Sequence, residues 1–129
     1  MSDSQRSLST HVLLVEDHLS LRRILVRTLT SAGFQVTAAE NGDQARQMLE
    51  NNTLPDVLLS DIRMSGTLNG IQLARWVRAN RPSIAIILQT AYYEYYTDEF
   101  KVVQKPFGAE ELIAVLLEFS TLHTEAPTS

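Results

Sequence analysis

Four short apolar segments of this chain each lead into residues with charged or hydroxyl side chains. The segments and the residues at their ends are 11–15 with Glu16 and Asp17, 56–60 with Asp61, 84–88 with Thr90 after Gln89, and 100–104 with Lys105 and Pro106. If these segments are parallel neighbours in one sheet, their carboxyl ends meet at one edge, where such sheets bind their ligands. Three carboxylates, a hydroxyl and an ammonium would then share one crevice. That set of groups suits a divalent cation together with a phosphoryl group.

Helical patterns between the apolar segments predict an α/β fold. Apolar residues at spacings of three and four predict helices around 21–32, 45–49, 71–77 and 112–119, and residues 34–39 predict a further strand. Strands that alternate with helices over short connections form a parallel sheet with helices on both faces. The strands are apolar throughout, as a sheet buried on both faces requires. We therefore expect a three-layer, doubly wound sheet of five parallel strands.

Length and composition narrow the class of protein. The chain has 129 residues, enough for one domain with a real core, and we expect that domain over 11–120, between a loose N-terminus (1–10) and a loose polar tail (121–129). The absence of cysteine excludes disulfides and thiolate metal sites. A net charge of −4 argues against direct nucleic-acid binding. No apolar run approaches the roughly 18 residues that membrane insertion needs, so we expect a cytoplasmic protein.

Asp61 is the best candidate for a nucleophile, because it closes the apolar third strand. A carboxylate nucleophile must be ionised and held in line with the phosphorus atom. Mg²⁺ prefers oxygen ligands, commonly one or two carboxylates with waters and phosphate oxygens. Glu16, Asp17 and Asp61 can supply such ligands, and the cation would relieve the repulsion among the three carboxylates. These residues predict a Mg²⁺ site around a phosphoacceptor.

The other two strand ends carry groups that suit a phosphoryl group. Lys105 offers a compact positive charge to one phosphoryl oxygen, and the Thr90 hydroxyl can donate a hydrogen bond to another. Pro106 restricts the backbone after Lys105, and a cis bond there would aim the ammonium inward.

Each of these residues also has an ordinary structural explanation. Asp17 taken alone is best explained as a helix N-cap, Thr90 as a turn residue and Lys105 as a solvated charge. Asp61 is poorly explained as a cap, because Ile-Arg-Met follows it. His18 is better explained as a loop residue than as a metal ligand, because the chain lacks the cysteines that would join it in a cluster. Each ordinary explanation is plausible for its own residue, but it is improbable that all of them hold together.

In this order, and each after an apolar strand, Glu16-Asp17, Asp61, Thr90 and Lys105-Pro106 resemble the receiver domain of two-component response regulators. Residues 40–45 and 61–70 also resemble segments of that family. The resemblance covers about residues 11–120 and implies a flavodoxin-like sheet with strand order 2-1-3-4-5. Because no effector follows the domain, we expect a free-standing, single-domain receiver.

The resemblance also implies a role in a histidine–aspartate phosphorelay. Asp61 would take a phosphoryl group from a histidine kinase or a histidine phosphotransfer protein in a Mg²⁺-dependent reaction. The main-chain carbonyl of Arg63 would be a further metal ligand. Phosphorylation would alter the binding of a protein target that the sequence does not identify. Such a domain is not an enzyme beyond catalysing its own phosphorylation and dephosphorylation.

The chain departs from the family pattern between its last two strands. Thr90 and Lys105 are 105 − 90 = 15 positions apart, about two turns short of a complete fourth helix. We expect that helix to be missing, reduced or irregular, and all four tyrosines lie in this interval. Val102 occupies the position of the family's usual switch aromatic, with Phe100 two residues earlier on the same strand face.

Two other functions remain open at this point. A pseudo-receiver that only binds a partner is favoured by Val102 and by the short interval, but disfavoured by the full set of polar strand ends. A phosphohydrolase with an aspartyl-phosphate intermediate often has a second Asp two residues after the nucleophile, and Arg63 occupies that position here.

Overall fold

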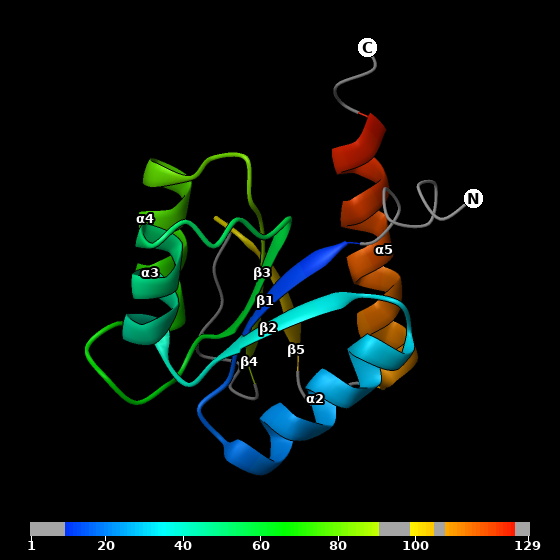
Figure 1. Ribbon diagram of the computed structural model, residues 1–129, viewed down its shortest axis with the longest axis horizontal. Coiled ribbons are helices and arrows are strands. Elements are labelled where there is room, and N and C mark those ends of the chain that lie inside the picture. Colours follow the sequence, from blue (N-terminus) through cyan, green and yellow to red (C-terminus); the bar gives the residue numbers. More distant parts are fainter. Residues whose placement is uncertain (1–9, 91–98, 105–107, 126–129) are drawn as a thin grey trace.

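A five-stranded parallel sheet forms the centre of the molecule, as a computed structural model shows for residues 10–90, 99–104 and 108–125 (Figure 1). The strands are β1 (His11–Val15), β2 (Gln35–Ala39), β3 (Val57–Asp61), β4 (Ala85–Thr90) and β5 (Lys101–Gln104). Their order across the sheet is β2-β1-β3-β4-β5, and every neighbouring pair is parallel. The predicted fold class and strand order are confirmed.

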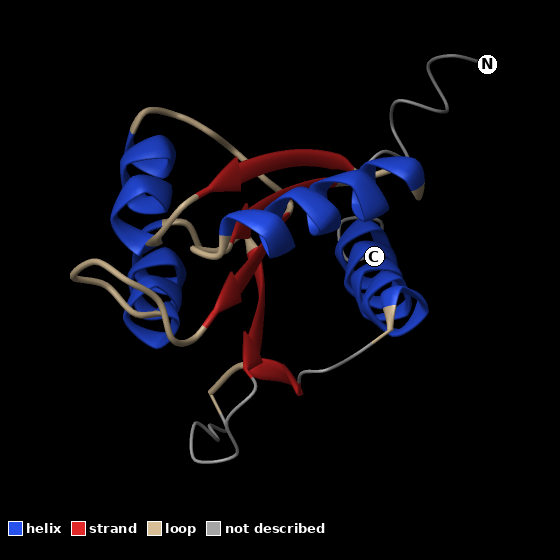
Figure 2. Ribbon diagram, turned by 90° about the horizontal axis from the view of Figure 1, so that it is seen from below, coloured by secondary structure: helices blue, strands red, loops and turns tan. Residues whose placement is uncertain are grey.

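Helices cover both faces of the sheet, so the molecule has three layers (Figure 2). The helices are α2 (Leu19–Ser31), α3 (Gly42–Glu50), α4 (Gly70–Asn80) and α5 (Ala109–Glu125). Helices α2 and α5 pack on one face, and α3 and α4 pack on the other. Four helices in the described part of the chain agree with the prediction that the helix between β4 and β5 is missing, reduced or irregular. Residues 91–98, which include all four tyrosines, lie outside the described residues.

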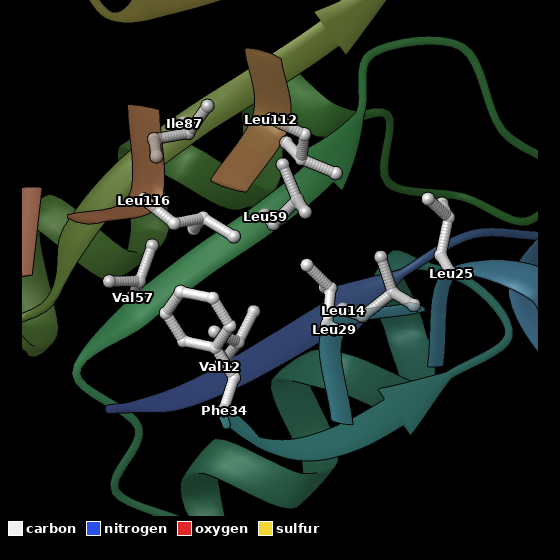
Figure 3. Close-up of a cluster of buried hydrophobic side chains, with 10 residues drawn as sticks. All are labelled: Val12, Leu14, Leu25, Leu29, Phe34, Val57, Leu59, Ile87, Leu112 and Leu116. Carbon is white, nitrogen blue, oxygen red and sulfur yellow. The ribbon is translucent and has the colours of Figure 1, made fainter. Parts of the chain in front are cut away.

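The strands are buried on both sides because alternate residues along each strand pack into two different cores. Leu14, Leu59 and Ile87 point toward α2 and α5, whereas Leu13 and Leu58 point toward α3 and α4. The first of these cores also contains Val12, Leu25, Leu29, Phe34, Val57, Leu112 and Leu116 (Figure 3). Burial on both faces explains why these strands are apolar throughout rather than alternately polar. The same alternation decides on which face each polar residue at a strand end lies.

Both ends of the expected domain need correction. Thr10 was expected in the loose N-terminus, but it is buried and its carbonyl oxygen accepts a hydrogen bond from the Gln35 N–H at 2.9 Å. This bond extends the β1–β2 ladder by one residue. Helix α5 was expected to end near residue 120, but it continues to Glu125. It can continue because no glycine or proline occurs between 109 and 125. The remaining terminal residues, 1–9 and 126–129, lie outside the described part of the chain.

Among the described residues, none of the helices combines the length and the apolar character that crossing a bilayer demands.

Candidate functional site

Three carboxylates meet at the carboxyl ends of β1 and β3. Glu16, Asp17 and Asp61 each offer an oxygen atom, and these oxygens all lie within 4.8 Å of one another. Val15 pairs with Ser60 in the register of the two strands, so the residues that follow them are neighbours at the sheet edge. Glu16 and Asp61 are buried, with 2% and 5% of their surface exposed, whereas Asp17 faces solvent. The structure thus brings together the three residues that the sequence singled out.

This carboxylate cluster fits a hard cation. Three negative charges in close proximity repel one another, and burial of two of them strengthens that repulsion. A divalent cation with oxygen preference would offset it, and the donor set matches Mg²⁺ better than a metal that prefers nitrogen or sulfur. Within the described part of the chain, no His or Cys belongs to the cluster.

Hydrogen bonds fix the first part of the cluster to helix α2. The Glu16 carboxylate (Oε2) accepts the His18 N–H at 3.1 Å, and Arg22 Nη1 donates to the Glu16 main-chain carbonyl at 2.8 Å. His18 is the N-cap of α2, and its Nδ1 accepts the Leu21 N–H at 3.5 Å. The capping role considered for Asp17 therefore belongs to His18.

Two aspartates hold the loop that follows Asp61. Asp17 Oδ2 accepts the Ser65 N–H at 3.0 Å. Asp43, in the first turn of α3, accepts the Thr67 N–H at 2.8 Å and also the Thr67 hydroxyl. The hydrogen bonds from Thr67 lower the pKa of Asp43. Asp43 is not among the site residues that the sequence predicts, although it lies directly after the Asn41-Gly42 turn signal.

Arg63 lies in this loop, and its side chain is exposed. Its proposed main-chain contact with a cation stays a prediction.

Thr90 ends β4 and is buried, with 5% of its surface exposed. Its partner in the β4–β5 register is Gln104, the last residue of β5. Lys105 and Pro106 lie outside the described residues, so their predicted contacts with a phosphoryl group and the predicted cis bond are untested.

Val102 and Phe100 pack together on the α4 side of the sheet, against a small core of Ile62, Ala74 and Leu88. Phe100 is half-buried, and the Arg78 guanidinium lies 4.6 Å from its ring centroid. Among the described residues, Phe100 is the aromatic residue that packs against this small core.

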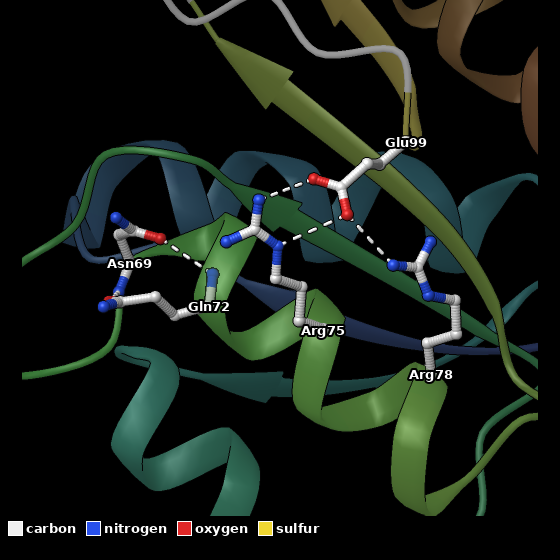
Figure 4. A network of polar contacts seen from close by, with 5 residues as sticks. All are labelled: Asn69, Gln72, Arg75, Arg78 and Glu99. Atoms are coloured by element: carbon white, nitrogen blue, oxygen red, sulfur yellow. Dashed lines mark hydrogen bonds and ion pairs between the residues drawn. The ribbon is translucent and has the colours of Figure 1, made fainter.

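Glu99 ties the start of β5 to helix α4 (Figure 4). Its carboxylate accepts from Arg75 Nη2 at 2.6 Å and from Arg78 Nη2 at 3.0 Å. A capping box of Asn69 and Gln72 begins the same helix, with hydrogen bonds of 2.8 Å in both directions. The hydrogen bonds from Arg75 and Arg78 lower the pKa of Glu99. These two ion pairs therefore connect Glu99, just before β5, to helix α4.

We expect the Glu99 carboxyl to titrate below its ordinary pKa of 4.5 in an NMR titration. Because the pKa of Glu99 is lower in the folded state, its ion pairs with Arg75 and Arg78 stabilise the fold fully at pH values above the unfolded-state pKa. That contribution is lost as the pH falls from about 4.5 through the folded-state pKa. Arg75→Met should raise the pKa of Glu99 toward its ordinary value, whereas Arg27→Met on α2 should leave it unchanged. An unaltered Glu99 pKa in Arg75→Met would contradict the ion pair between these two residues.

Comparison with known proteins places this geometry in context. A family model described as "Response regulator receiver domain" matches residues 12–117. The DNA-binding transcriptional regulator NtrC of Klebsiella pneumoniae is 36% identical over 110 residues, which cover 80% of this chain and 23% of NtrC. The chain therefore spans about a quarter of the length of that relative. The response regulator receiver protein CpdR of Brucella abortus is 33% identical over 109 residues, covering 79% of this chain and 89% of CpdR.

Solved structures show the same architecture. The response regulator TrrA of Thermotoga maritima, in complex with Mg²⁺-BeF, aligns with a TM-score of 0.78 and 29% identity. That alignment covers 85% of this chain and 98% of TrrA. A response regulator receiver protein from Sinorhizobium medicae aligns with a TM-score of 0.79 and 28% identity, covering 89% of this chain and 97% of that protein.

Proposed function

We propose, from the premise that this chain belongs to the response regulator receiver domain family, that Asp61 accepts a phosphoryl group in a two-component phosphorelay. A receiver domain is a phosphoacceptor signalling module rather than a classical enzyme. The single observation that carries the proposal is the meeting of Glu16, Asp17 and Asp61, whose oxygens lie within 4.8 Å of one another. Of the three, Asp61 is the residue that closes a fully buried central strand.

In the proposed reaction, a carboxylate oxygen of Asp61 attacks the phosphorus atom of a phosphohistidine. A P–O bond forms while the P–N bond breaks. The electron pair of the broken bond stays on the imidazole nitrogen, which takes a proton from solvent. Glu16, Asp17, Asp61 and the main-chain carbonyl of Arg63 would hold Mg²⁺, which supplies positive charge to the phosphoryl oxygens.

Thr90 and Lys105 would bind the transferred group from the other side. The Thr90 hydroxyl would donate a hydrogen bond to one phosphoryl oxygen, and the Lys105 ammonium would neutralise another. The position of Thr90 at the end of the strand next to β3 supports its part in the proposal. The complex of TrrA with Mg²⁺-BeF supports the choice of Mg²⁺.

The proposed donor is a histidine kinase or a histidine phosphotransfer protein, and the output is altered binding of a protein target. The match to CpdR covers 89% of that protein, which supports the view that a receiver domain can make up nearly a whole protein. The match to NtrC is confined to about a quarter of that regulator, so it carries nothing about DNA binding.

Incubation with Mg²⁺ and acetyl phosphate, followed by intact-mass spectrometry, tests the proposal. We expect the protein to gain the mass of one phosphoryl group, and we expect Asp61→Asn or chelation of Mg²⁺ to abolish that gain. Asp56→Asn is a matched control, because Asp56 lies at the opposite end of the same strand, where it accepts the His11 N–H at 2.8 Å. This variant should be modified like the wild type.

Two results would point to the other functions. Continuous hydrolysis of excess acetyl phosphate without accumulated modification indicates a phosphohydrolase. No modification, even with a cognate kinase, indicates a module that only binds its partner.

A further inference from the structure

Gln89, near the end of β4, carries a fully buried amide. Its exposed surface is 0%, and neither Oε1 nor Nε2 has a hydrogen-bond partner in the part of the chain that the structure describes. Burial of an amide without a partner is costly, because the group gives up its hydrogen bonds to water and receives none in return. An aliphatic residue would fill this place without that cost, as Ile87 and Leu88 do just before it.

The position of Gln89 places it beside the proposed phosphoacceptor. Gln89 on β4 is the register partner of Asp61 on β3, and its main-chain oxygen accepts the Ile62 N–H at 3.0 Å. Leu59 and Ile87, two residues earlier on each strand, share the core that faces α2 and α5. Because side chains alternate along a strand, Asp61 and Gln89 lie on that same face. Adjacent strands are about 4.8 Å apart, within reach of a glutamine side chain.

Phosphorylation of Asp61 would supply hydrogen-bond acceptors for the Gln89 amide. A phosphoryl group brings three strong acceptor oxygens, and a glutamine amide offers two N–H donors. We propose that Gln89 Nε2 donates a hydrogen bond to a phosphoryl oxygen on Asp61. Gln89 is then a phosphoryl-binding residue in addition to Thr90 and Lys105. This inference rests on the proposed function and adds to it a hydrogen-bond donor on β4.

Beryllofluoride with Mg²⁺, used as a stand-in for the phosphoryl group, tests the inference without a covalent step. Gln89→Met keeps an unbranched side chain of similar length and removes the amide. We expect Gln89→Met to bind beryllofluoride about tenfold more weakly, the effect of losing one hydrogen bond to a charged group. In the absence of ligand, its thermal midpoint should equal or exceed that of the wild type, because an unpaired buried amide is gone. Gln89→Leu should behave in the same way.

Gln104→Met is the matched control. Gln104 Nε2 is also buried and has no partner among the residues that the structure describes, but Gln104 lies on β5, two strands away from Asp61. Because β4 lies between β5 and β3, the Gln104 side chain is farther from Asp61 than the side chain of Gln89. This variant should bind beryllofluoride like the wild type.

The outcomes separate this inference from the proposed function. Wild-type affinity for beryllofluoride in both Gln89 variants would overturn the inference alone. An equal loss of affinity in Gln104→Met would also overturn it, because the effect would not be specific to the position beside Asp61. If the wild-type protein itself bound no beryllofluoride and accepted no phosphoryl group, the proposed function would fail together with the inference.

Discussion

Gly70→Ala is expected to lower the free energy of unfolding by about 3 kcal/mol, the upper part of the usual range for an overpacked site. Gly70 is buried and begins α4, and its N–H donates to the Ile62 carbonyl oxygen at 2.7 Å. A Cβ at this position would collide with the main-chain oxygen of Asp61 and would lie 2.7 Å from the Cα of Ile62. Because these are backbone atoms, they cannot rotate away, so either α4 or the end of β3 must move.

The direction of the change in stability distinguishes overpacking at Gly70 from an effect of helix propensity. At an unhindered helical position, alanine is better than glycine by up to about 1 kcal/mol. Urea unfolding should therefore show a lower midpoint for Gly70→Ala with an unchanged slope. Gly108→Ala is the control, because the nearest atom to its added Cβ is Glu111 Oε1 at 3.9 Å. Equal midpoints for Gly70→Ala and the wild type would show that the two elements do not approach so closely in solution.

The sheet and the carboxylate cluster could be predicted from the sequence because both follow from local patterns. Apolar runs such as 11–15 and 56–60 identify buried parallel strands, and parallel strands bring their carboxyl ends to one edge whatever the side chains are. Glu16, Asp17 and Asp61 then come together because they stand at the carboxyl ends of two adjacent strands. The face shared by Phe100 and Val102 follows from the two-residue period of a strand in the same way.

The contacts that hold helix α4 and the loop after Asp61 in place could not be predicted, because they join residues far apart in the chain. Glu99 pairs with Arg75 and Arg78, which come more than twenty residues earlier, and any of several exposed charges could have served as partner. Asp43 follows the Asn41-Gly42 turn signal in the sequence, and only the fold shows that Thr67 donates a hydrogen bond to it.

Gln89 shows a different limit of sequence analysis. In the sequence it is only the residue between an apolar segment and Thr90. The register partner of a strand residue is set by the whole sheet, so the place of Gln89 beside Asp61 became visible only in the structure. The same holds for the lack of a partner for its amide among the described residues.

Leu59→Ala is expected to lower the free energy of unfolding by about 2–5 kcal/mol and yet to leave the phosphoryl chemistry in place. Leu59 is fully buried in the core between the sheet and helices α2 and α5 (Figure 3). Removal of its isobutyl group leaves a cavity that the rigid central strands cannot close. The carboxylate cluster is built from strand ends and from hydrogen bonds such as Asp17 to Ser65, none of which involves the Leu59 side chain.

Urea unfolding measures the first part of this prediction, and phosphorylation by acetyl phosphate well below the midpoint measures the second. Leu117→Ala is the control, because 52% of the Leu117 surface is exposed and its truncation should change the free energy of unfolding by no more than about 0.5 kcal/mol. Equal stability of the Leu59 variant and the wild type would contradict the core described here. Loss of phosphorylation in a Leu59 variant that is still folded would mean that the core on this face positions Asp61, so that strand ends and local hydrogen bonds are not sufficient to build the site.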